Sequence, residues 1–151
     1  MYLVKDILSE KGYEVYTVEP EATVYEALKK MAGKNVGALL VVKDEQVVGV
    51  FSERDYARKI ILRGKSSKDS TVGELLSERI FYVKPFTSTN ECMQIMTDHR
   101  VRHLPVLDGE KLVGIVSIGD IVNKVMLSQK NTIKQLEDYI LGKTLPEKNT
   151  P

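Results

Sequence analysis

The chain of 151 residues has no tryptophan and a single cysteine, Cys92. One cysteine excludes an internal disulfide framework and a cysteine-rich zinc site. Apolar runs are short, such as residues 37–42, whereas a membrane-spanning helix needs roughly 20 apolar residues. Net charge is also nearly absent, because 22 basic residues balance 21 acidic ones to leave +1. These absences give no reason to expect binding to nucleic acid or to a membrane.

The first residues lack the features of a signal peptide. Residues 1–6 contain neither a basic segment nor an apolar one, so we expect a cytoplasmic location. Apolar residues make up 42% of the chain and charged residues 28%, as in an ordinary globular protein. A chain of this length buries roughly 70% of the surface of its unfolded state, which is enough to fold without disulfides.

An internal repeat organises the chain. A shift of 65 residues aligns residues 13–57 with residues 78–122 without a gap, and it places Asp55 on Asp120. Many of the other aligned pairs are identical or keep their apolar character. The chain is therefore predicted to contain two copies of one structural unit.

Each copy begins with a short helix. Residues 4–11 resemble residues 72–79 at a spacing of 68, so the first copy carries three extra residues around Gly12. In the first copy Val4 and Ile7 are apolar residues that lie on one helical face.

The rest of each copy reads as strand, helix, two strands and helix. Thr23 with Glu26, and Ser88 with Glu91, have the spacing of a capping box at the start of the first long helix. The expected elements are residues 15–18, 24–34, 38–42, 47–51 and 53–62 in the first copy, and residues 80–83, a helix after Ser88, 104–107, 112–116 and 118–129 in the second. A separate amphipathic helix is expected over residues 130–143.

These elements predict an α+β fold. Each β-α-β-β-α unit is too small to be stable alone with a half-exposed sheet. We therefore expect two pseudo-symmetric units, residues 4–65 and 72–129, to pack sheet to sheet. The polar residues 63–70 would link them.

Two pairs of motifs carry a resemblance to a known family. One pair, residues 35–41 and 100–106, falls on the second strand of each copy, and the other pair, residues 52–55 and 117–120, follows the third strand. With these motifs in register, the chain resembles a stand-alone pair of CBS domains, named after cystathionine β-synthase and also called a Bateman module. The resemblance covers roughly residues 4–126. CBS pairs variously bind AMP, ADP, ATP, NAD, S-adenosylmethionine or no ligand.

The resemblance also implies where a ligand would lie. The base would pack on one copy, and the ribose and phosphate would contact the other copy. The first expected site consists of Tyr16, Val36, Gly37, Ala38, Ser117, Gly119 and Asp120. The pseudo-symmetric site consists of Ile80, Phe81, Val101, Arg102, Ser52, Arg54 and Asp55. Because Arg102 and His103 stand where the first copy has Gly37 and Ala38, the two sites should not be chemically equivalent.

The repeated Ser-x-x-Asp motif has the chemistry that a nucleotide requires. It lies where a strand ends and a helix begins, so unpaired N–H groups there favour a phosphate. The aspartate, Asp55 or Asp120, can accept hydrogen bonds from the two ribose hydroxyls. The same spacing is also an ordinary N-terminal cap, which satisfies only the backbone. We favour the nucleotide because the motif occurs twice in register and because of the family resemblance.

Positive side chains near these motifs are candidates for phosphate contacts. Arg102 and His103 should lie beside Ser117, and the matching family positions contact phosphate. His103 would also make the site sensitive to pH near neutrality. Cys92 aligns with the small residue Ala27, so it is expected to be a buried core residue and not a nucleophile.

We therefore expect a regulatory module and not an enzyme. It would bind an adenosine nucleotide, with AMP as the first choice and ADP, ATP or NAD as alternatives, and act on an unidentified partner protein in trans. No metal or catalytic cofactor is expected. A homodimer is expected, since CBS pairs commonly associate through their helices. Two other functions stay open: a ligand-free dimerisation scaffold, and a nucleotide hydrolase, for which the sequence offers no assignable base or nucleophile.

Overall fold

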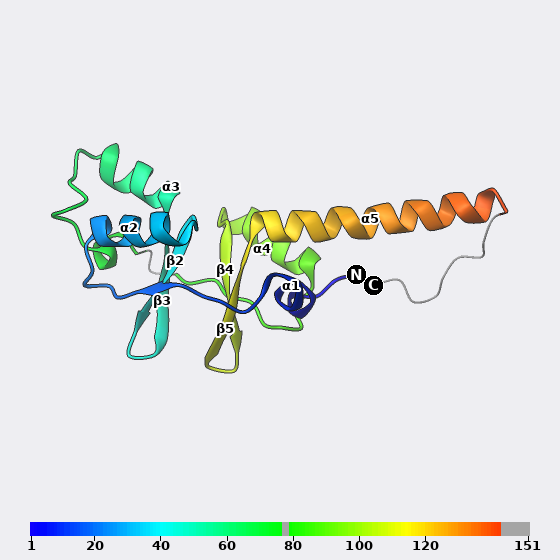
Figure 1. Ribbon diagram of the computed structural model, residues 1–151, viewed down its shortest axis with the longest axis horizontal. Helices are drawn as coiled ribbons and strands as arrows, with labels where there is room; N and C mark the ends of the chain where they lie inside the picture. Colours follow the sequence, from blue (N-terminus) through cyan, green and yellow to red (C-terminus); the bar gives the residue numbers. More distant parts are fainter. Residues whose placement is uncertain (77–78, 143–151) are drawn as a thin grey trace.

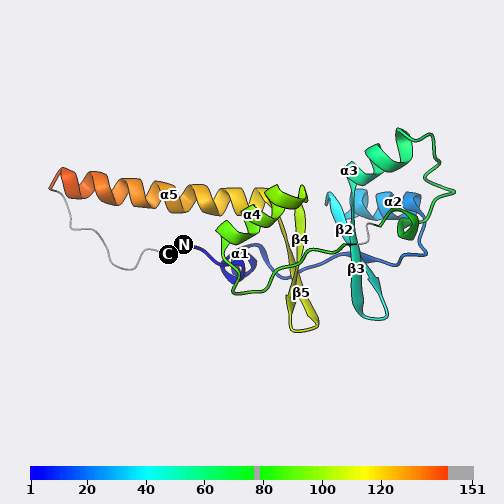
Figure 2. The ribbon, with the colours of Figure 1, turned by 180° about the vertical axis from the view of Figure 1, so that it is seen from behind.

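Two antiparallel hairpins lie side by side at the centre of the computed structural model, which describes residues 1–76 and 79–142 (Figure 1). The first hairpin joins β2 (Ala38–Lys43) to β3 (Gln46–Ser52), and the second joins β4 (His103–Asp108) to β5 (Lys111–Ser117). Helices lie on the outer side of each hairpin, as Figure 2 shows from behind. The predicted α+β fold of two repeats is confirmed. Within the described ranges, none of the helices has the length and apolar character to cross a bilayer.

The first repeat follows the expected order up to the end of its sheet. β1 (Thr17–Val18) pairs in parallel with β2, and α2 (Val24–Lys34) begins where the Thr23 side chain accepts a hydrogen bond from the Glu26 N–H at 3.1 Å. The helix expected over residues 53–62 is regular only in its first turn.

That first turn is α3 (Glu53–Asp55), and the chain then widens into the π-helix η1 (Tyr56–Ile61). The N–H of Leu62 reaches back five residues to the Ala57 carbonyl, at 3.2 Å. A helix therefore follows β3 as predicted, but it changes from α to π geometry after its first turn.

The second repeat differs at its first strand. Residues 80–83 do not form the expected strand, because only Val83 makes a bridge, to Val106. In the first repeat the N–H of Leu40 donates to the Tyr16 carbonyl at 3.1 Å. Pro105 occupies the position equivalent to Leu40 and has no N–H, so that ladder bond cannot form.

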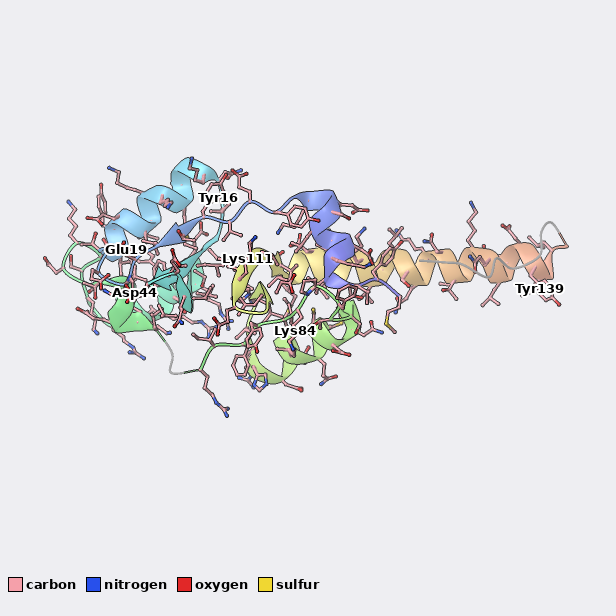
Figure 3. All side chains as sticks on the ribbon, turned by 90° about the horizontal axis from the view of Figure 1, so that it is seen from below. Tyr16, Glu19, Asp44, Lys84, Lys111 and Tyr139 are labelled. Atoms are coloured by element: carbon pink, nitrogen blue, oxygen red, sulfur yellow. The ribbon has the colours of Figure 1, made fainter. Side chains whose placement is uncertain are left out.

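The second repeat continues through the short 3₁₀-helix η2 (Val72–Leu75), α4 (Thr89–His99) and α5 (Ile118–Ile140). α5 is one helix without a break, so the expectation of a separate helix over residues 130–143 was wrong; residue 143 lies outside the described residues. The later turns of α5 extend well beyond the sheets (Figure 1), and Tyr139 lies near the far end in Figure 3.

The opening helix of each repeat packs against the other repeat. α1 (Val4–Lys11) contributes Val4, Ile7 and Leu8 to the core of the second repeat. In return, Val72 and Leu75 of η2 belong to the core of the first repeat. Each core is therefore completed by a segment from the opposite end of the sequence, and neither repeat is self-contained.

Two glycines allow this exchange. A Cβ added to Gly114 in β5 would lie 2.7 Å from Cδ2 of Leu8, and one added to Gly49 in β3 would lie 2.6 Å from Cδ2 of Leu76. Both contacts are far below ordinary van der Waals distance. The equivalent glycines of the two central hairpins thus let the exchanged segments approach the sheets.

Gly114→Ala should lower the free energy of unfolding by about 1–3 kcal/mol, as overpacking does in a filled core. Leu8 is only 1% exposed, so it has little room to move aside. Gly33→Ala in α2 is the control, because its Cβ would meet nothing within 4 Å and alanine favours a helix. Urea unfolding measured by circular dichroism checks both. Equal stability of Gly114→Ala and the parent would contradict the packing argument.

Candidate functional site

A cavity of about 280 Å³ lies between the two repeats. The first repeat lines it with the end of β3 and the turn of α3. The second repeat lines it with the extended segment before Val83 and with the residues leading into β4. The lining residues are Gly49, Val50, Ser52, Arg54, Asp55, Arg79, Ile80, Phe81, Arg100, Val101, Arg102 and His103.

One of the two predicted residue sets is brought together in this cavity. All its members line the wall: Ile80, Phe81, Val101, Arg102, Ser52, Arg54 and Asp55. His103, predicted as a phosphate contact, lines it too. Sequence reasoning missed Arg79 and Arg100, although each directly precedes a predicted residue. An isolated surface arginine is usually only solvated, so position in the chain alone did not single them out.

Asp55 holds the end of β3 and still presents an oxygen. Its Oδ2 accepts hydrogen bonds from the Ser52 N–H at 2.9 Å and the Ser52 hydroxyl at 3.0 Å, and the Asp55 N–H donates to Ser52 Oγ at 3.2 Å. Oδ1 has Lys59 Nζ at 3.4 Å. The capping function considered for this motif is therefore present. Because it uses Oδ2, Oδ1 is the oxygen available to a ligand.

Apolar side chains form another part of the cavity wall. The ring of Phe81 stacks on His99, with 3.9 Å between centroids and 17° between planes. Val101 packs against the core of the second repeat. Since these residues are held against the protein, they form a wall and do not fill the space.

Among the described residues, four arginines line the cavity and make it positive, and Asp55 is the one carboxylate that lines it. Within residues 1–76 and 79–142, no ion pair neutralises Arg54, Arg79, Arg100 or Arg102. The nearby Arg58 guanidinium, together with burial and the charges of Arg102 and Arg100, holds the pKa of Arg54 below its usual value, although Asp55 opposes this effect. The site is therefore a concentration of uncompensated positive charge.

Arg100 occupies a backbone position that does not favour arginine. It caps α4 in the left-handed region, at φ 54°. Asn35 caps α2 at the equivalent position with the same φ. Helix C-terminal positions of this kind prefer glycine or asparagine. The second repeat thus keeps an unfavourable residue where its guanidinium reaches the cavity.

The pseudo-symmetric junction at the start of α5 is occupied by the protein itself. Lys11 Nζ lies 2.8 Å from Asp120 Oδ2 and donates to the Ile115 carbonyl at 3.0 Å. The Ser117 N–H donates to the same Asp120 oxygen at 2.9 Å. Burial alone would raise the pKa of Asp120, but the Lys11 ammonium and Ser117 outweigh it and lower that pKa. The carboxylate expected to bind a second ribose is engaged by Lys11.

Apart from Gly119, the other members of the first predicted set lie just before β1 or around the start of β2. Tyr16 is half-buried, its pKa is raised chiefly by a hydrogen bond to Glu14, and Lys34 Nζ lies 5.4 Å from its ring centroid. The Gly37 carbonyl accepts the Glu53 N–H at 3.1 Å, and Ala38 pairs with Ser52.

Val36 packs against the core of the first repeat, and Gly119 lies in the first turn of α5. As a ligand site, this first predicted set stays a prediction.

The two junctions share a backbone but differ in charge. The side chains facing the cavity at positions 54, 100, 102 and 103 are three arginines and a histidine. The 65-residue shift aligns them, in that order, with Gly119, Asn35, Gly37 and Ala38. Arg79 corresponds, at a spacing of 68, to Lys11. Arginines have therefore accumulated on the Asp55 side, whereas Lys11 lies beside the Asp120 carboxylate.

His103 lies between the two junctions. It pairs with Ser117 in the second hairpin and also lines the cavity beside Asp55. Burial is the largest influence on its pKa and lowers it, helped by Lys11 and opposed by Asp120 and Asp55. The imidazole is therefore largely neutral at pH 7 and serves as a hydrogen-bonding group.

Cys92 is fully buried in the core of the second repeat, as predicted. Burial, with the neighbouring Glu91 charge, raises its pKa to about 11, so the thiol stays protonated at neutral pH. In the part of the chain that the structure describes, no cluster of three or more His, Cys, Asp or Glu side chains is placed to hold a metal ion.

Comparison with known proteins gives two matches to the family model described as CBS domain, over residues 4–62 and 72–127. The mitochondrial CBS domain-containing protein CBSX3 of Arabidopsis thaliana is 39% identical over 148 residues, which cover 92% of this chain and 72% of that protein. A solved structure of a protein with CBS domains from Burkholderia ambifaria is 49% identical, has a TM-score of 0.79, and is matched over 85% of this chain and 96% of that one.

A more distant structural match is the CBS domain pair of protein MJ0100, solved with 5′-methylthioadenosine and S-adenosyl-L-methionine. It is 24% identical with a TM-score of 0.73, over 83% of this chain and 96% of that one. At this identity the likeness shows the fold alone.

Lys11→Met should raise the pKa of Asp120 toward its ordinary value, because the side chain keeps its length and loses its charge. A lowered carboxyl pKa stabilises the fold above the unfolded-state pKa, and this stabilisation is lost as the pH falls through the folded-state pKa. At pH 7 the free energy of unfolding of the parent should therefore exceed that of the variant by about 0.2–1 kcal/mol. The difference is small because the side chains of Lys11 and Asp120 are 35% and 25% exposed. The difference should disappear in strong acid.

Carboxyl NMR titration and urea unfolding across this pH range measure the two quantities. Lys5→Met, on the same helix, should leave the pKa of Asp120 unchanged. An unaltered Asp120 titration in Lys11→Met would contradict the assignment of the ion pair.

Proposed function

Because the chain belongs to the CBS-domain family, we propose that it is a regulatory module that binds one adenosine nucleotide in the cavity beside Asp55. The observation that carries the proposal is the composition of this cavity. A carboxylate, an apolar wall and a group of arginines surround one space between the repeats. These are the three chemistries that a ribose, a purine and a phosphate need.

Different residues of the cavity contact the ribose, the base and the phosphate. Oδ1 of Asp55 accepts the ribose hydroxyls, since Oδ2 is engaged by Ser52. Ile80, Phe81 and Val101 provide the surface against which the base packs. The arginines meet the phosphate, because a guanidinium can donate two parallel hydrogen bonds to phosphate oxygens.

One ligand binds per chain in this proposal. At the equivalent junction Lys11 Nζ pairs with Asp120 Oδ2 at 2.8 Å and places a lysine beside that carboxylate. The positions that carry Arg102 and Arg54 on the Asp55 side are glycines there. A phosphate at that junction would meet neither guanidinium, so binding is favoured at the Asp55 side.

An adenosine ligand is supported by the fold and by the wall of the cavity. The CBS pair of MJ0100 holds two adenosine compounds, so a pair of this architecture has room for such a molecule. Binding between the repeats would change how they sit against each other, and this is how we propose that the module signals to another protein. A ligand-free scaffold is the alternative, favoured by the capping role of Asp55.

We also propose that two chains associate through α5. Met126, Ile133 and Ile140 recur every seven residues on this helix, with Leu136 between the last two. All four are at least half exposed, at 50%, 55%, 78% and 53% respectively. Lys130 precedes the acidic pair at 137–138 on the projecting turns, so two antiparallel copies would place opposite charges together. A second copy of the chain would bury this stripe.

Asp55→Asn should weaken adenosine nucleotide binding by about 10–100-fold, because charge-assisted hydrogen bonds contribute about 1.5–3 kcal/mol. Asp120→Asn is the matched control: it removes the same charge from the equivalent cap and should leave the affinity unchanged. Isothermal titration calorimetry with AMP and ADP measures both affinities and the number of ligands per chain. No binding of any adenosine nucleotide to the parent at millimolar concentration would reject the proposal and favour the scaffold.

Ile133→Gln should weaken dimerisation at least tenfold, because it places a polar side chain at the centre of the apolar stripe. Lys134→Gln introduces the same residue at the next position, outside the stripe, and should dimerise like the parent. Light scattering over a dilution series measures the association. A parent chain that is monomeric at every concentration, or equal behaviour of the two variants, would refute the α5 interface.

A further inference from the structure

We infer that the cavity selects adenosine nucleotides with a chain of two or three phosphates, such as ADP or ATP, over AMP. This inference rests on the proposed function and deepens it. It is based on the number and placement of the arginines in the cavity lining, Arg79 and Arg100 among them.

The cavity lining carries more positive charge than a monophosphate neutralises. The described lining of the cavity contains four arginines and one carboxylate, Asp55. A terminal phosphate carries about two negative charges at pH 7, so AMP would leave part of the positive charge uncompensated. Each further phosphate in the chain adds negative charge and neutralises more of it. NAD also contains two phosphates, but both are diesters and its nicotinamide ring is positive, so it fits this cavity less well than ADP.

The arginines come from separate parts of the chain. Arg54 is adjacent to Asp55, whose carboxylate fixes the ribose end of the ligand. Arg102 and Arg100 lie before β4 of the other repeat, and Arg79 comes from the extended segment that leads to Ile80. Three separate segments therefore contribute guanidinium groups. A single phosphate uses the groups nearest the ribose, whereas a phosphate chain extends toward the others.

Arg100 has a backbone conformation that is unfavourable for arginine. Its left-handed conformation is held at a position where the first repeat has Asn35. Asparagine there would cap α4 equally well. The arginine therefore contributes something other than helix termination, and its guanidinium lines the cavity. Repulsion among the unpaired arginines is likewise unfavourable until an anion enters.

The test compares phosphate-chain lengths on the same protein. The full chain is titrated with AMP, ADP, ATP and NAD in buffer containing EDTA, so that the arginines and not a divalent cation must balance the phosphates. We expect ADP and ATP to bind at least tenfold more tightly than AMP or NAD. The advantage of ATP should shrink as salt rises, because screening weakens each added charge interaction.

Two variants identify the residues responsible. Arg100→Asn and Arg79→Gln should each reduce the ratio of ATP to AMP affinity at least threefold while leaving AMP affinity nearly unchanged. Arg100→Asn should also raise the melting temperature of the free protein, which separates the selectivity effect from misfolding. Arg63→Gln removes the same charge at an exposed position outside the lining and should leave the ratio unaltered.

The outcomes separate the two levels of the proposal. AMP binding as tightly as ATP, or an unchanged ratio in both variants, overturns the phosphate-chain inference and leaves adenosine nucleotide binding in place. Failure of every nucleotide to bind overturns both. Loss of AMP and ATP binding to the same extent in the variants would show that Arg79 and Arg100 hold the first phosphate, which also contradicts the inference.

Discussion

The two repeats pack together through the contact of Leu8 with Gly114 and the contact of Leu76 with Gly49. Each leucine comes from a segment that belongs by sequence to one repeat and packs against the strands of the other. A cavity lined by both repeats depends on this arrangement, because neither hairpin alone brings a carboxylate, an apolar wall and arginines together. The exchange also removes the need for a disulfide, which a single cysteine could not form.

The two repeats keep the same backbone geometry at their strand-to-helix junctions, but the side chains around the two junctions differ. Both junctions keep a serine cap and an aspartate with closely similar hydrogen bonds. Around Asp55 the neighbouring positions are basic, whereas around Asp120 a lysine of the same chain has taken the place next to the carboxylate. Two identical frameworks can therefore hold one binding site and one internal ion pair. The backbone repeat determines where a site is possible, and the charges determine which is used.

The sequence predicted most of the local structure, because apolar spacing, prolines and capping residues act over a few positions. It failed where a single residue changed the outcome, as Pro105 did by removing a ladder hydrogen bond. A separate helix was expected over residues 130–143, but α5 continues through Ile140 without a break. The pair of Lys11 and Asp120 joins residues 109 positions apart. No local sequence pattern indicates such a contact. The ion pair between Lys11 and Asp120 is therefore seen only in the folded structure.

α5 connects the partly exposed junction at Ser117 and Asp120 to an exposed end in one continuous helix. Its first turn is fixed by Ser117 and Asp120, and its 23 residues run without a kink-forming proline or an internal break. A helix of this length is about 35 Å long. A tilt of about 5° at its base therefore moves the far end by about 3 Å. A small movement of the sheets, which leaves their hydrogen bonds intact, therefore becomes a larger displacement at the far end of the helix.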